Sequence, residues 1–67
     1  MSGAAFICQD VPGYSMRVVR VFEELGGRLL PKASLSITLD GEIIAAPSVS
    51  LDIVQAVAAH ILEHPAP

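Results

Sequence analysis

An unbroken alternation of polar and apolar residues near the middle of the chain constrains its fold most strongly. Residues 34–39 read Ser-Leu-Ser-Ile-Thr-Leu, and residues 42–46 read Glu-Ile-Ile-Ala-Ala. Asp40-Gly41 lies between the two runs, and such a pair is typical of a two-residue hairpin turn, because both turn positions need a positive φ. The pattern therefore predicts a β-hairpin over residues 34–46.

The same alternation predicts which face of the hairpin each side chain occupies, because successive residues of a strand point to opposite faces. One face is expected to be buried and to carry Leu35, Ile37, Leu39, Ile44 and Ala46. The other face is expected to carry Ser34, Ser36, Thr38 and Ile43. An uncharged face of this kind packs against another protein surface at little cost, so these last four residues are candidate interface residues.

Apolar residues recur at helical spacing on both sides of the hairpin. Residues 16–25 predict a first helix, with Ser15 as its cap and Gly26-Gly27 ending it. A second helix is expected after Pro47, capped by Ser48 or Ser50 and ended by Pro65. Its buried stripe would consist of Leu51, Val54, Val57, Ala58, Ile61 and Leu62.

The first apolar run, residues 4–9, fits either a strand or an extended arm. Residues 28–32 are expected to form a connector, since Pro31 opposes regular strand pairing. We therefore expect residues 1–67 to form one α+β domain in the order β-α-β-β-α. Two helices would pack on one face of a small, mainly antiparallel sheet that contains the 34–46 hairpin.

The composition suggests that part of the apolar surface is covered by another chain. Hydrophobic residues make up 52% of the 67 residues and charged residues only 16%, whereas soluble domains average about 25% charged residues. A domain of this size buries only about 60% of its unfolded surface, and one cysteine allows no internal disulfide. We expect an interaction module without catalysis of its own, either a homo-oligomer or the minor subunit of a larger assembly.

Charge and hydropathy disfavour several other classes of protein. The net charge is −3 with only four basic residues, so nucleic acid binding is disfavoured. No apolar run reaches the 18 or so residues of a membrane span. The single free cysteine fits a reducing compartment, which predicts a cytoplasmic protein.

A small-molecule-binding protein or an enzyme with its site at an oligomer interface is the alternative function. Arg17 and Arg20 would lie one turn apart on the exposed face of the first predicted helix, where they are anion-binding candidates. The competing interpretation is a solvated helix face on which these arginines pair with Glu23 and Glu24. No catalytic residue and no cofactor are expected.

His60-Ile61-Leu62-Glu63-His64 near the end of the second predicted helix forms an H-x-x-E-H string. It resembles the signature of the inverted zinc peptidases, in which two histidines one turn apart bind zinc and the glutamate acts as a general base. That resemblance implies His60 and His64 as zinc ligands. Histidine is also favoured near a helix C-terminus, because its protonated, positively charged form interacts favourably with the helix dipole. We therefore expect no bound metal, and His60 and His64 remain weak candidates.

The predicted order of elements resembles the first part of the phosphocarrier protein family HPr. Gly13, Arg17 and Phe22 fall at matching spacings around the first predicted helix, and Ser48 falls near that family's regulatory serine. The position of the phosphorylated histidine is Ser15 in this chain. The resemblance therefore implies a shared topology and not phosphotransfer.

Ser50-Leu51-Asp52 at the head of the second predicted helix resembles the phosphopantetheine attachment segment of acyl carrier proteins. The competing interpretation is a helix cap followed by an acidic residue in the first turn.

Overall fold

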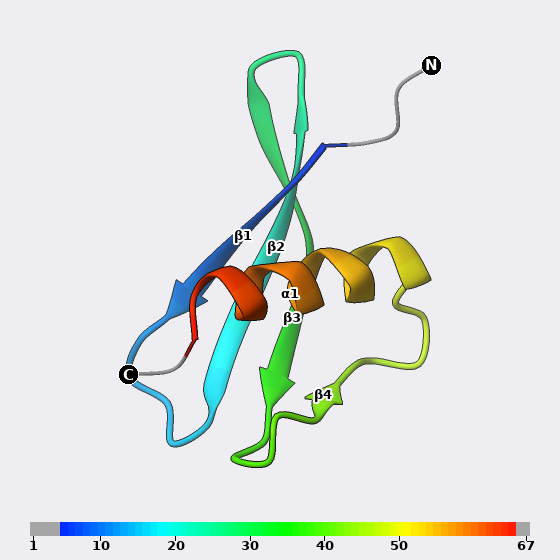
Figure 1. The fold of residues 1–67 in the computed structure, drawn as a ribbon. Helices are drawn as coiled ribbons and strands as arrows, with labels where there is room; N and C mark the ends of the chain where they lie inside the picture. The colour runs from blue at the N-terminus through cyan, green and yellow to red at the C-terminus, as the bar shows by residue number, and fades with distance from the viewer. Residues whose placement is uncertain (1–4, 66–67) are drawn as a thin grey trace.

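The computed structural model describes residues 5–65, which form a four-stranded antiparallel sheet crossed on one face by a helix (Figure 1). The elements are β1 (Ala5–Val11), β2 (Arg17–Leu25), β3 (Arg28–Ile37), β4 (Ile43–Ile44) and α1 (Leu51–Glu63). Strands adjacent in sequence are adjacent in the sheet, in the order β1-β2-β3-β4.

The α+β class and the antiparallel sheet are confirmed. The predicted β-α-β-β-α order with two helices is wrong, since the described residues contain one helix, after all four strands.

The segment predicted as the first helix is the strand β2. Val18, Val21 and Leu25 have helical spacing, but Val19 and Val21 also alternate with polar or half-exposed neighbours, so the segment fits both periods. β-Branched valines favour the strand, because their restricted χ1 suits a pleated surface better than a helix. β1 and β3 flank β2 and supply hydrogen-bond partners along both of its edges. Of the apolar run predicted as either a strand or an arm, residues 5–9 belong to the strand β1, and residue 4 lies outside the described residues.

Gly26-Gly27 turns the chain between β2 and β3 and does not end a helix. The two residues have φ of 58° and 79°, and two successive positive φ values are typical of a type I′ hairpin turn. The chain therefore continues directly into β3, and residues 28–32 belong to that strand and not to a connector. Pro31 is tolerated there because β4 pairs only with Ser36 and Ile37, so the second edge of β3 needs no N–H at Pro31.

The β3–β4 hairpin exists, but its turn is one residue longer than predicted. The Gly41 N–H donates to the Thr38 carbonyl at 2.9 Å, and the Thr38 N–H donates to the Glu42 carbonyl at 2.9 Å. Gly41 has φ of 87°, which is typical of a three-residue turn closed by a glycine bulge. Ile37 consequently pairs with Ile43, one residue away from the pairing that an Asp-Gly turn would impose.

This shift exchanges the faces predicted for two isoleucines, because a slip of one residue inverts every side chain of a strand. Ile43 packs against the core and not on the face with Ser34 and Ser36. Ile44 lies on the opposite face and is 50% exposed. Leu39, predicted to be buried, lies in the turn and is fully exposed.

Helix α1 begins and ends where the sequence predicts. The Ser50 side chain caps it by accepting a hydrogen bond from the Ile53 N–H at 3.4 Å, and Asp52 lies in its first turn. The predicted buried stripe is wrong in part. Val57 is buried as predicted, but Leu51 and Leu62 are largely exposed. The other buried residue of α1 is Ile53, which the predicted stripe did not include. The core between α1 and the sheet consists of Val19, Val21, Leu35, Ile37, Ile53 and Val57.

With 13 residues α1 is too short to cross a bilayer, and the part of the chain that the structure describes contains no longer helix.

Candidate functional site

Only one face of the sheet is covered by α1, and the other face, here called the outer face, is open (Figure 1). Directly paired residues of neighbouring strands point to the same face, so the strand registers define which side chains the outer face carries. Its large apolar side chains are Ile7, Val11, Val18, Phe22, Leu29 and Ile44. Three of them are about half exposed: Ile7 at 43%, Leu29 at 52% and Ile44 at 50%.

The outer face carries two charges of opposite sign, Arg20 and Glu24, both on β2. The Arg20 guanidinium lies 5.3 Å from the centroid of the Phe22 ring, a cation–π contact. The Glu24 carboxylate accepts a hydrogen bond from the Gly27 N–H at 2.9 Å. The ion pair between Arg20 and Glu24 expected on a helix is therefore replaced by these two contacts. Together they leave a neutral and mostly apolar surface.

Two of the four predicted interface residues, Ser34 and Ser36, lie on the outer face, opposite Arg20 and Val18. Thr38 instead holds the β3–β4 turn, where its hydroxyl accepts a hydrogen bond from the Glu42 N–H at 3.0 Å. Ile43 lies on the side that α1 covers. The apolar residues of β1 and β2 were missed because the alternation in β2 was interpreted as a helix. The Gly-Gly pair between two β-rich runs was the signal that could have revealed them.

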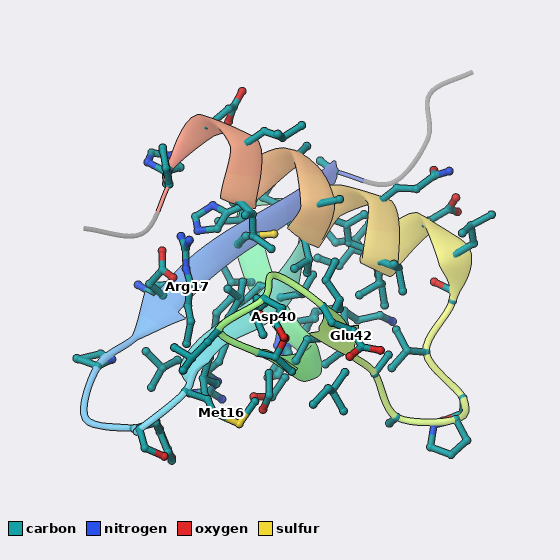
Figure 2. All side chains as sticks on the ribbon, turned by 60° about the horizontal axis from the view of Figure 1, so that its bottom comes forward. Met16, Arg17, Asp40 and Glu42 are labelled. Atoms are coloured by element: carbon teal, nitrogen blue, oxygen red, sulfur yellow. The ribbon has the colours of Figure 1, made fainter. Side chains whose placement is uncertain are left out.

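A polar cluster joins the C-terminal end of α1 to β1 and β2. The Arg17 Nε donates to Asp10 Oδ1 at 2.7 Å, and its Nη2 donates to Asp10 Oδ2 at 3.2 Å and to the His64 carbonyl at 2.6 Å. The His60 Nε2 lies 2.8 Å from Asp10 Oδ2. Figure 2 shows Arg17 pointing toward the end of the helix, whereas Met16 points away from it.

Electrostatics in this cluster are dominated by the bond between Arg17 and Asp10. Hydrogen bonding from Arg17, supported by His60, lowers the pKa of the Asp10 carboxyl from 3.8 to about 2. The same bond raises the pKa of Arg17. Two open grooves, of about 580 and 490 Å3, border Arg17. Arg17, the cation that borders both grooves, is already neutralised by Asp10. The cluster of Asp10, Arg17 and His60, here called the clasp, therefore holds α1 on the sheet.

The predicted anion-binding pair is not assembled. Arg17 pairs with Ile37 and lies on the face covered by α1, whereas Arg20 pairs with Ser34 and lies on the outer face. The two arginines are three positions apart along the strand, so their side chains point to opposite faces.

The candidate metal ligands lie close together without forming a metal site. The rings of His60 and His64 have centroids 4.8 Å apart, but His60 is engaged by Asp10. Within residues 5–65 no group of three histidine, cysteine or acidic side chains is placed to hold a metal ion. Cys8 is partly buried beside the core, and burial, followed by the charge of Asp10, raises the pKa of its thiol. A protonated thiol of this kind behaves as a small apolar side chain.

No protein-family model, curated protein or solved structure matches this chain. The element order of residues 5–65 also differs from the order on which the resemblance to HPr rested.

Proposed function

We propose that this protein is a self-association module whose outer face packs against the outer face of a second copy. The observation that carries this proposal is the chemistry of that face: among the paired residues of the described strands, it carries six large apolar side chains and two charges, which are of opposite sign. Exposed apolar patches framed by polar residues are typical of protein interfaces. The function is thus one of assembly and not of catalysis.

The second copy is favoured over an unrelated partner because the charges of the outer face are complementary to themselves. Arg20, Phe22 and Glu24 follow one another at every second position of β2, which lies between β1 and β3. Phe22 is therefore roughly 7 Å from each charged residue along the strand. A two-fold axis that lies in the plane of the interface, perpendicular to β2 and level with Phe22, brings the two phenyl rings together. It also places Arg20 of each copy opposite Glu24 of the other.

A dimer contact of ordinary size would use a modest share of the surface of this chain. A stable interface buries about 800 Å2 of each partner, which is roughly one sixth of the 4827 Å2 accessible surface of this chain. Two sheets that pack in this way lie about 10 Å apart, with their side chains interdigitated.

Charge reversal tests this arrangement, with association measured by sedimentation velocity from about 1 to 100 μM, a range that begins at the weak, μM end of the affinities of interfaces of this size. The wild type is expected to form a dimer or a larger closed assembly. Arg20→Glu or Glu24→Arg alone places like charges opposite one another and should weaken association at least about tenfold. The Arg20→Glu/Glu24→Arg double variant should recover most of the lost affinity.

Arg28→Glu is the matched control. It changes the net charge as Arg20→Glu does, but it lies at the β2–β3 turn, opposite Leu25. Association that responds equally to Arg28→Glu and Arg20→Glu would contradict the proposed contact. A wild type that stays monomeric over the whole range would refute the proposed function.

A further inference from the structure

β1 is an edge strand without the features that normally prevent edge strands from pairing. It pairs with β2 along all seven residues, Ala5 to Val11, without a register shift, and no strand of the described chain lies on its other side (Figure 1). Natural sheets protect such edges with proline, lysine, bulges or very short strands. β1 contains no proline, lysine or bulge. Its one charge, Asp10, is neutralised by Arg17.

The opposite edge of the sheet, in contrast, is protected in several ways. β4 has only two residues and covers only Ser36 and Ile37 of β3. The remaining edge of β3 contains Pro31, which has no N–H to donate. The register between β2 and β3 shifts after Val21, where Lys32 is one additional residue in β3. Lys32 also forms an ion pair with Glu23 at 3.4 Å. A second copy therefore presents one unprotected edge of full length, namely its own β1.

We propose that β1 pairs antiparallel with β1 of a second copy, which joins the two four-stranded sheets into one continuous sheet. The pairing of identical edges closes a dimer, whereas pairing of β1 with the β3 edge would repeat without end. Full overlap of two copies of Ala5–Val11 is centred on Cys8. Each Cys8 then faces its counterpart, and Phe6 lies opposite Asp10 of the partner. This contact uses the β1 edge of the sheet and not its outer face, so the experiments that test it are independent of the proposed function.

Amide hydrogen exchange, followed residue by residue by NMR, is the first test. In a free edge strand every second N–H points to solvent and exchanges rapidly, while its neighbours bonded to β2 are protected. Pairing through β1 predicts slow exchange at all of the consecutive amides from Phe6 to Asp10. Alternating fast and slow amides at concentrations at which the protein is associated would refute the inference.

Disulfide trapping is the second test, and Cys8 is the only cysteine of the chain. Directly opposed residues of antiparallel strands have Cα atoms about 4.5–5.5 Å apart, within the range that a disulfide spans. Mild copper-catalysed oxidation of the native protein should therefore link most chains through Cys8. The control is Cys8→Ser/Val11→Cys, which places the thiols about 20 Å apart in the same pairing and should not become linked. Equal linking of both variants would show random collision and would contradict the inference.

Both tests are repeated in Arg20→Glu, which weakens the outer-face contact. If Arg20→Glu stays linked through Cys8 with a fully protected β1, the edge contact is confirmed independently of the outer face. If the wild type is associated through the outer face but neither Cys8 linking nor complete protection of β1 is found, only the edge contact is refuted.

Discussion

Two adjacent isoleucines on opposite faces of β4 allow the register of the β3–β4 hairpin to be tested. Ile43 packs against the core, whereas Ile44 is 50% exposed on the outer face. Truncation of a fully buried isoleucine to alanine costs about 2–5 kcal/mol. Because Ile43 is only partly buried at the end of the sheet, we expect Ile43→Ala to cost about 2 kcal/mol, near the lower limit of that range. Ile44→Ala should cost less than about 1 kcal/mol, since half of its surface is already in water.

Urea denaturation followed by far-ultraviolet circular dichroism resolves this difference. A chain of 67 residues is expected to have an unfolding free energy of about 3–10 kcal/mol. With a urea dependence of about 1 kcal/mol per molar, Ile43→Ala should lower the midpoint by about 2 M and Ile44→Ala by less than about 1 M. The measurement is made at several protein concentrations, because Ile44 also lies on the proposed interface and its effect should shrink on dilution.

The outcome that would refute this reasoning is specific. If Ile44→Ala costs as much as or more than Ile43→Ala at the lowest protein concentration, then Ile44 faces the core. The two-residue Asp40-Gly41 turn would in that case be the correct one, and Ile43 would replace Ile44 on the outer face.

Three further outcomes are expected. Since Arg17 and then His60 lower the pKa of Asp10 from 3.8 to about 2, the ionised carboxylate stabilises the fold above pH 3.8, and this contribution is lost as the pH falls through about 2. Asp10→Asn should therefore flatten the acid limb of a plot of stability against pH, by on the order of 1 kcal/mol after allowance for solvent screening, and an unchanged limb would contradict the role of the clasp. Gly27→Ala should destabilise the protein by about 1–2 kcal/mol in thermal unfolding, because Gly27 has φ of 79°, and a neutral effect would argue against the type I′ turn. Ser50→Ala should cost about 1 kcal/mol and reduce the helical circular dichroism signal, whereas no change in either would show that the Ser50 cap is dispensable.

The sequence by itself predicted the elements whose signals are local. The cap at Ser50, the helical spacing after it and Pro65 beyond its end all lie within or beside residues 50–65, and α1 follows that pattern. The alternation of Ser34 to Ile37 likewise predicted which side chains of β3 are buried, and Leu35 and Ile37 are indeed in the core. Neighbouring residues specify such features, so no knowledge of distant contacts is needed.

Tertiary structure decided what local signals left open. Residues 17–25 fit a helix or a strand, and pairing with β1 on one side and β3 on the other makes them a strand. A single additional turn residue decided which of Ile43 and Ile44 faces the core. Asp10 and His60 are 50 residues apart in the sequence, and no local pattern connects them. Contacts of this kind depend on hydrogen bonds and burial between distant segments, which exist only once the whole sheet has formed.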